Sequence, residues 1–299
     1  MNEYKVICPL FNFQIPWNVL TPFQEITKEK VIHPFKEQKK QIVEKIELIE
    51  GVEIRRISKE DLEDIKNSIF PLPRDILPSP NMFVLEKYIT TEDGHDFQLD
   101  QTMRNIVLSL RLLKKGHVSG NCIFYVLVSE KRKRFASVER SCEGAHLGAK
   151  PWILGKYVLH FEEIPALKEI LQKIQSIHFV ERKRLRLACK RFQRAYEEDD
   201  FEDRLIDFMI AFEALFVRKE IPGSHFGQKI ANGCSDVLGK NNEEREEIRS
   251  FLSEAYYIRN RIVHGAEYRK PRVDKEYGMF EFVPKIEDYL RKSIKKLLD

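Results

Sequence analysis

The spacing of hydrophobic residues changes near residue 164, and this change constrains the fold of the 299-residue chain more than any other feature. Before it, apolar residues come in short runs rich in β-branched and aromatic side chains, which is typical of strands. After it, they recur at intervals of three and four over long segments, as in amphipathic helices. The sequence therefore predicts an α+β protein, with a mixed α/β domain over residues 1–163 and an all-α helical bundle over residues 164–299.

The first domain shows strand-like runs separated by turns and two helical segments. The runs are YKVICPLFNF (4–13), VEIRRIS (52–58), NMFVLEKYI (81–89), NCIFYVLVS (121–129), RFASVE (134–139) and YVLHFE (157–162). We predict helices from Lys59 to Ile69, with Ser58 and Asp61 as a capping box, and near 101–115. Residues 70–80 hold four prolines and predict a loop. The charged EKRKR (130–134) predicts a hairpin tip between two strands.

Six helical segments make up the second domain. They are residues 164–177, 181–198, 201–219, 224–239, 242–265 and 284–298. The connections between them are short and polar, which favours antiparallel neighbours in a bundle. The role of residues 1–163 stays open between a sensor, a substrate-recognition unit and a regulatory unit.

Composition and motifs exclude several classes of protein. No run approaches the roughly 20 apolar residues of a membrane span, and the amino terminus is a poor signal peptide. The five cysteines are scattered, which favours reduced thiols and a cytoplasmic protein without membrane partners. The sequence lacks G-x-x-x-x-G-K-[ST], G-x-G-x-x-G and H-E-x-x-H. We therefore expect no metal and no cofactor.

The most unusual stretch is AYYIRNRIVHGAEY, residues 255–268. Plotted at about 100° per residue, the helix that contains it has one broad apolar face. That face comprises Phe251, Leu252, Ala255, Tyr256, Ile258, Ile262 and Val263. Arg259 falls near its centre. Because an unpaired buried charge costs several kcal/mol, this arginine must pair with an acid or face an anion.

The helix from Leu205 to Val217 carries the opposite anomaly. It is apolar over most of its circumference, which is typical of a helix at the centre of a bundle, and Glu213 lies in the middle of its stripe. In one interpretation Glu213 and Arg259 form a buried ion pair. In the other, Arg259 faces a phosphate, and Glu213 can still orient it.

A different side of the helix around Arg259 carries further polar groups. Asn260 and His264 are four residues apart and lie near Tyr257, while Arg261 lies toward solvent. Histidine exchanges protons near neutral pH, and the forked guanidinium of arginine matches phosphate. Together they suit the cleavage of RNA by its own 2′-hydroxyl, which yields a 2′,3′-cyclic phosphate and a 5′-hydroxyl.

The segment from residue 181 to 198 has one strongly basic side. Its cations are Arg182, Lys183, Arg186, Lys190 and Arg194, with Arg184 and Arg191 at the margin. Leu185, Ala188, Cys189, Phe192, Ala195 and Tyr196 form the inner side. The basic side is either a solvated face balanced by acids elsewhere or a surface that tracks phosphates.

These residues resemble the HEPN superfamily. Its R-N-x-x-x-H pattern matches Arg259-Asn260-Arg261-Ile262-Val263-His264. The fuller IRNRIVHG, preceded about fifty residues upstream by DRLIDFMIAFEALF, is similar to the Apea-like group. The resemblance covers roughly residues 180–299 and does not extend to the first domain.

The resemblance implies a metal-independent endoribonuclease in which two HEPN bundles form a homodimer and place both motifs in one cleft. Arg259 and His264 would be catalytic, with Asn260 beside them. Supporting or RNA-binding roles would fall to Arg261, Tyr257, Glu213, Arg182, Lys183, Arg186, Lys190 and Arg194. The expected partners are single-stranded RNA or tRNA, a second copy, and an antitoxin or regulatory protein. Members act in antiviral defence, in toxin–antitoxin pairs and in stress responses.

Two other interpretations remain open at this point. The family also contains catalytically inactive modules that bind RNA or protein and dimerise, and the bundle could be purely structural. Residues five apart on a straight helix differ by about 140° in direction, so Arg259 and His264 would not converge within one protomer. A dimer whose apolar stripes pack together, with the last turn loosened, would resolve this. Alternatively, Arg261 and His264 form the exposed pair.

Overall fold

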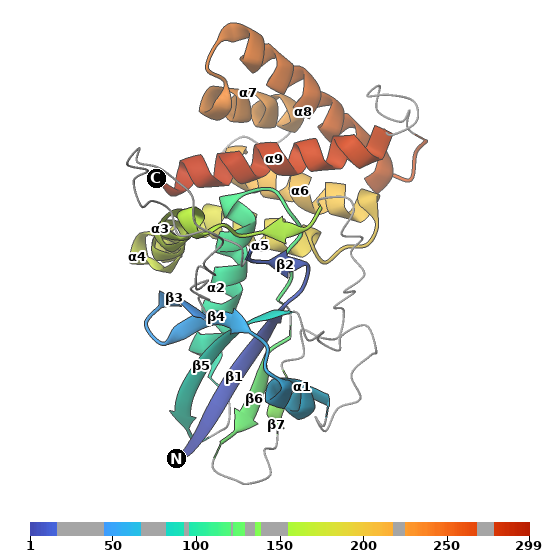
Figure 1. Ribbon diagram of the computed structural model, residues 1–299. Coiled ribbons are helices and arrows are strands. Elements are labelled where there is room, and N and C mark those ends of the chain that lie inside the picture. Colours follow the sequence, from blue (N-terminus) through green and yellow to red (C-terminus); the bar gives the residue numbers. More distant parts are fainter. Residues whose placement is uncertain are drawn as a thin grey trace, which may run out of the picture.

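The computed structural model has a sheet at one end and a helical bundle at the other, which confirms the α+β class (Figure 1). It describes residues 1–16, 45–66, 82–92, 96–120, 122–128, 135–138, 155–217, 225–267 and 278–299. The predicted loop at 70–80, the hairpin tip at 130–134 and residues 67–69 of the first predicted helix lie outside these ranges.

An antiparallel six-stranded sheet forms the amino-terminal part. Its order is β3 (Lys45–Ile49), β4 (Val52–Arg56), β5 (Phe83–Thr91), β1 (Asn2–Leu10), β6 (Phe124–Leu127) and β7 (Phe135–Val138). Strand β1 is paired on both sides, over its full length with β5, from Asn2 opposite Thr91 to Leu10 opposite Phe83. The pairing of β6 with β7 confirms the predicted hairpin.

Two of the predicted strands need correction, and one strand was missed. Strand β3, KIELI, was not predicted, although its alternating burial is that of a half-buried strand. The run at 4–13 forms two strands, β1 and β2 (Phe13–Gln14), because the chain turns at Asn12, whose φ is 55°. The run at 157–162 keeps only β8 (Tyr157–Val158), which pairs with β2, and a short 3₁₀ helix follows it.

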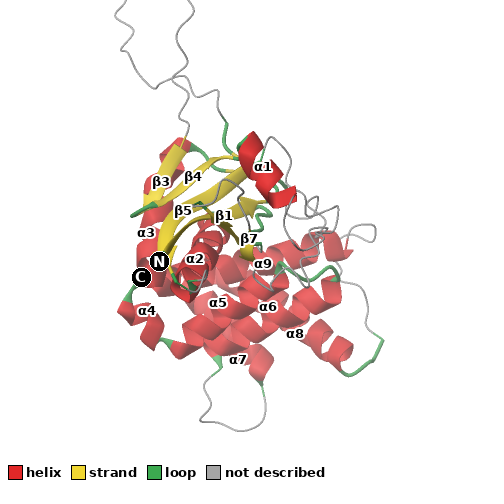
Figure 2. Ribbon diagram, turned by 90° about the horizontal axis from the view of Figure 1, so that it is seen from below, coloured by secondary structure: helices red, strands yellow, loops and turns green. Residues whose placement is uncertain are grey.

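Helices cover both faces of the sheet (Figure 2). On one face, β1 and the neighbouring strands pack against α1 (Lys59–Lys66) through Leu62 and Ile65. On the other face they pack against α2 (Phe97–Leu113), through residues such as Met103 and Ile106. The helix predicted near 101–115 thus begins at Phe97, because Asp96 caps it by accepting hydrogen bonds from two backbone amides.

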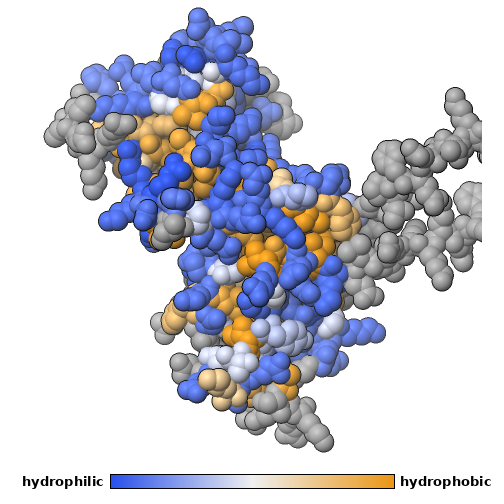
Figure 3. Space-filling model, turned by 90° about the vertical axis from the view of Figure 1, so that its left-hand side faces the viewer, coloured by the Kyte–Doolittle hydropathy of each residue, from blue (hydrophilic) through white to orange (hydrophobic). Residues whose placement is uncertain are grey.

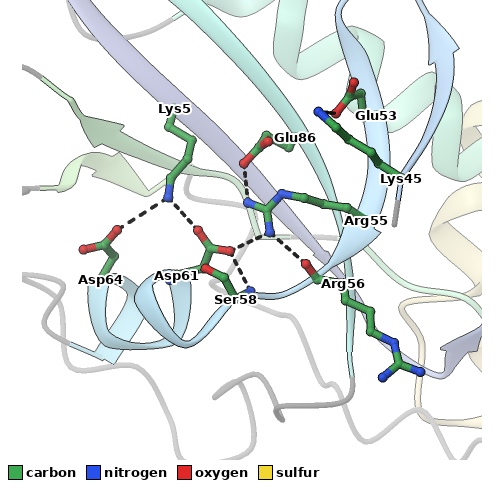
Figure 4. Close-up of polar contacts among 9 residues, drawn as sticks. All are labelled: Lys5, Lys45, Glu53, Arg55, Arg56, Ser58, Asp61, Asp64 and Glu86. Carbon is green, nitrogen blue, oxygen red and sulfur yellow. Dashed lines mark hydrogen bonds and ion pairs between the residues drawn. The ribbon is translucent and has the colours of Figure 1, made fainter. Parts of the chain in front are cut away.

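A buried ionic network attaches α1 to the sheet (Figure 4). Asp61 is fully buried and accepts hydrogen bonds from Lys5 Nζ at 2.6 Å and Arg55 Nη1 at 2.7 Å. Arg55 also pairs with Glu86 on β5. Ser58 and Asp61 form the predicted capping box, with bonds of 2.8 and 3.0 Å. Burial raises the pKa of Asp61, but the hydrogen bonds from Arg55 and Lys5 outweigh it and hold this pKa below its usual range.

We expect Asp61→Asn to lower the free energy of unfolding at neutral pH by about 3–5 kcal/mol, because Lys5 and Arg55 lose a buried anionic partner. Urea denaturation followed by circular dichroism measures the change. Glu63→Gln is the control, since Glu63 is exposed on the same helix. Equal stability of the two variants would contradict a stabilising role for the network.

The second half of the chain folds into the predicted bundle. Its helices are α3 (Ile164–Gln175), α4 (Ile177–Glu181), α5 (Lys183–Ala195), α6 (Phe201–Phe216), α7 (Phe226–Leu238), α8 (Asn242–Val263) and α9 (Gly278–Leu298). Helix α6 is central and packs against α5, α7, α8 and α9. A break at Arg182 separates α4 from α5, and α9 begins six residues before Pro284, where the prediction had placed its start. Within the described residues, no helix has both the length and the apolar composition needed to span a membrane.

Helices α2 and α3 join the sheet to the bundle. Leu108 and Leu112 of α2 belong to the core of the bundle. Leu167 and Leu171 of α3 belong to the core beneath the sheet. The two regions that the sequence distinguishes at residue 163 therefore share continuous apolar packing.

Polar groups are buried at this junction. Arg111 of α2 is 1% exposed, donates from Nε to the Val118 carbonyl at 2.9 Å, and lies 4.4 Å from the ring centre of Tyr196. The Tyr196 hydroxyl donates to Glu287 of α9 at 2.8 Å, and Arg291 Nε donates to the same carboxylate oxygen at 3.2 Å. Burial raises the pKa of Glu287 to about 7, although Arg291 and Tyr196 lower it in part.

The raised pKa of Glu287 predicts a pH-dependent stability. Between the ordinary pKa near 4.5 and the folded value of about 7, the folded chain keeps a proton that the unfolded chain has lost, so stability falls as pH rises. We expect the free energy of unfolding of Glu287→Gln to match that of the parent at pH 5. At pH 8 it should be about 2 kcal/mol higher than that of the parent. Denaturation at both pH values tests this, with the exposed Glu162→Gln as control. A constant difference between the two pH values would contradict it.

Candidate functional site

Four helix ends meet at one end of the bundle: the starts of α5 and α7 and the ends of α6 and α8. Arg184, at the start of α5, donates to the carbonyls of Ala214, Leu215 and Val217 at the end of α6. Near the start of α7, Gly227 lies against Tyr256 of α8, and a Cβ there would come within 2.9 Å of the tyrosine ring. Antiparallel packing therefore brings segments far apart in sequence to one place.

Arg259 pairs with Glu213 across α8 and α6. Arg259 Nη2 lies 3.2 Å from Glu213 Oε1, with the two side chains 18% and 25% exposed. The contact is an ion pair without hydrogen-bond geometry, since Glu213 Oε1 and Arg259 Nε are buried atoms without a hydrogen-bond partner. Burial raises the pKa of Glu213, and Arg259 offsets part of the effect. Within a single chain, Arg259 therefore forms the ion pair with Glu213 that the first interpretation had suggested.

His264 lies at the exposed end of α8. The helix stays regular to Val263, and the His264 amide donates to the Asn260 carbonyl at 3.1 Å. Gly265, with φ 63°, ends the helix in a Schellman motif: its amide donates to Ile262 and that of Ala266 to Arg261. The last turn is therefore not loosened. His264 is exposed, and it does not share the side of α8 on which Arg259 meets Glu213.

The other residues of the motif lie around these two. Asn260 accepts a hydrogen bond from Arg259 Nη1 at 3.0 Å. Tyr257 is 57% exposed, as expected for the side that carries His264. Arg261 donates twice to the Glu267 carbonyl, at 2.8 and 2.5 Å, and so holds the chain that leaves the helix.

The apolar stripe of α8 is used within the protomer. Phe251 and Ile258 are buried in the bundle core, and the Phe251 ring lies 4.9 Å from that of Phe282. The sequence had suggested that a second copy packs against this stripe. The stripe is instead largely covered within the chain itself. Val263, assigned to the stripe, is instead 50% exposed because α8 ends there.

The basic side of α5 divides into two parts. Its inner residues are all buried, as predicted. In the second half, Arg191 and Arg194 pair with Asp207 of α6 at 2.8 and 3.3 Å. Arg182, Lys183, Arg186 and Lys190 are exposed and make no ion pair within the described residues, and the Arg186 guanidinium donates to the Val180 carbonyl. Three of these cations, Arg182, Lys183 and Arg186, lie at the same end of the bundle as the motif.

A hollow of about 510 Å³ lies between the start of α7 and the end of α8. It is lined by His225, Phe226, Gly227, Gln228, Ser253, Tyr256 and Asn260. The sequence interpretation missed this hollow, because its walls come from two helices whose pairing no local pattern reveals. Gly227 within a helical segment was the available signal, since such a glycine often marks a close approach.

A larger hollow of about 700 Å³ lies elsewhere, between α3, the start of α8 and the end of α9. Figure 3 views the side on which the carboxy terminus lies and shows apolar side chains surrounded by hydrophilic ones. Lys173, in its wall, pairs with Glu169 at 2.7 Å and with Asp299 at 2.5 Å. The lysines and carboxylates that line this larger hollow offset one another, and the motif lies at the other end of α8. We therefore place the candidate site at the four helix ends.

No family model matches the chain, and neither a curated protein nor a solved structure matches it. The resemblance to HEPN proteins therefore rests on the motif and its helical context. Among the described residues, no group of three or more His, Cys, Asp or Glu side chains is placed to hold a metal ion.

The Glu213–Arg259 pair can be tested by a double-mutant cycle. We expect Arg259→Ala to lower the free energy of unfolding by about 2 kcal/mol, less than the ~3–5 kcal/mol of a fully buried pair, because both side chains retain some contact with water. Adding Glu213→Gln should recover part of the loss by removing the uncompensated carboxylate. Strictly additive effects would show that the pair contributes nothing to stability.

Proposed function

We propose that this protein is a metal-independent endoribonuclease of HEPN type, which cuts single-stranded RNA or tRNA to leave 2′,3′-cyclic phosphate and 5′-hydroxyl ends. The observation that carries the proposal is an arginine held in an apolar helix face, five residues before an exposed histidine, at a basic end of the bundle. A role in prokaryotic defence, as a toxin or in a stress response follows from the resemblance.

The proposed reaction needs few groups. The 2′-hydroxyl loses its proton, and its oxygen attacks the adjacent phosphorus. The bond from phosphorus to the 5′-oxygen breaks, and the leaving 5′-oxygen takes up a proton. His264 transfers these protons, since imidazole can accept and donate near neutral pH. Arg259 stabilises the charge that develops on the phosphoryl oxygens. Asn260 holds the guanidinium through its hydrogen bond.

The arrangement argues for two copies of the chain. Within one protomer Arg259 faces Glu213 while His264 faces outward. The exposed apolar side chains next to the motif are Tyr257 and Val263. In a homodimer that packs through these residues, two histidines and two arginines would line one cleft. The exposed cations at the start of α5 would then supply contacts to neighbouring phosphates.

A non-catalytic binding module is the second candidate, and the Glu213–Arg259 pair favours it. An arginine already paired with a carboxylate is less available to a phosphate. The same basic surface would then bind RNA or a partner protein without cutting it. This candidate predicts RNA binding that weakens steeply with salt and no cyclic-phosphate product.

RNA cleavage in EDTA tests the two candidates. We expect His264→Ala to reduce cleavage of single-stranded RNA by about 10²–10⁴-fold, the range typical for the loss of a general acid–base group. The products are identified by the 2′,3′-cyclic phosphate on one fragment. His264 is exposed, so its removal should leave the circular dichroism spectrum and the melting temperature unchanged.

His160→Ala is the matched control, because His160 is also exposed and lies outside the bundle. It should cut RNA at the parental rate. Equal cleavage by His264→Ala and the parent would rule out the catalytic assignment. RNA binding without any cleavage by the parent would favour the binding module.

A further inference from the structure

The hollow beside the motif has a wall chemistry that phosphate binding does not explain. Phe226 and Tyr256 contribute aromatic surface, and Gln228, Ser253 and Asn260 contribute neutral groups that donate and accept hydrogen bonds. Among the residues that the structure describes, no lysine, arginine or carboxylate lines it. The basic residues lie around it, with Arg259 beside Asn260 and Lys229 over the Phe226 ring at 5.7 Å.

Flat aromatic surface with amide and hydroxyl groups is the chemistry that recognises unpaired nucleobases. Proteins read single-stranded RNA by stacking splayed-out bases on aromatic rings and by hydrogen bonding to the base edges. The hollow, at about 510 Å³, falls within the roughly 300–1,000 Å³ of small-molecule sites. A charged phosphate, in contrast, would meet no lysine or arginine among the described residues of its walls.

We propose that this hollow binds one unpaired base of the RNA strand, next to the phosphate that the Arg259–His264 motif contacts. The inference rests on the proposed function and deepens it by assigning a binding site to the unpaired base beside the cut phosphate. Asn260 links the two parts, because it lines the hollow and also bonds Arg259. A base paired in a duplex cannot enter the hollow, so the site distinguishes single strands from double strands.

Two features of the fold shape the walls of the hollow. Gly227 lets the first turn of α7 approach the Tyr256 ring, where any Cβ would collide at 2.9 Å. His225, which precedes α7 and lines the hollow, has the left-handed φ of 71°. Such a backbone costs a non-glycine residue about 1 kcal/mol, and it sets the direction in which the chain enters the helix.

Equilibrium binding by full-length His264→Ala protein, which should not consume RNA, tests the proposal. The probes are short labelled homopolymers of each of the four bases and a duplex, all in EDTA. Phe226→Ala should weaken binding to single strands about fivefold or more, the effect typical of one lost stacking contact. It should leave duplex binding unchanged. Gln228→Ala should change the order of preference among the four bases.

The controls separate a folding defect from a lost contact. Gln228 and Ser253 are exposed, so their alanine variants should melt as the parent does. Asn232→Ala removes an exposed amide one turn further along α7 and should alter neither affinity nor base preference. Free nucleoside monophosphates are a further control. They should displace the labelled RNA only at concentrations far above that of the RNA.

The outcomes distinguish the inference from the function on which it rests. Unchanged single-strand affinity and base preference in both Phe226→Ala and Gln228→Ala would overturn the base site, while cleavage by the parent would still support the nuclease. If the parent neither binds nor cuts RNA, the proposed function fails and the base site with it. Binding of mononucleotides but not of RNA would also overturn the proposal.

Discussion

The burial of α6 is the constraint on which the rest of the bundle depends. This helix is apolar over most of its surface, and Phe208 and Phe212 are almost fully enclosed by α5, α7, α8 and α9. A helix that is apolar all round is stable only when other helices cover it. The start of α5 and the ends of α6 and α8 lie at one end of the bundle, and the polar exceptions on these helices meet there.

Glu213 and Arg259 show how a pair of partly buried charges organises such an end. Each would be costly alone in an apolar stripe, and each removes part of the cost of the other. Arg184 adds a second restraint by capping the carbonyls of α6 beside Glu213. The same two contacts that stabilise the fold therefore fix the position of Arg259 relative to the basic start of α5.

Much of the fold could be read from hydrophobic spacing and capping residues. The α+β class, the bundle helices and the capping box of Ser58 and Asp61 all follow from local pattern, because each depends on residues within a turn or two. Strand β3 and helix α4 were missed, since a short strand or helix is defined by the elements that pair with it or pack around it. The hollow between α7 and α8 had no local signal except Gly227.

The sequence by itself determined that Arg259 and Glu213 are anomalous, since helical spacing alone places both charges in apolar stripes. It also determined which side of α5 is basic and which is buried. Only the tertiary structure decided that the two anomalies pair, that Arg191 and Arg194 are occupied by Asp207, and that His264 is exposed on another side of α8. The physical reason is that helical spacing fixes directions within one helix, whereas the partner of a charge depends on how separate helices pack.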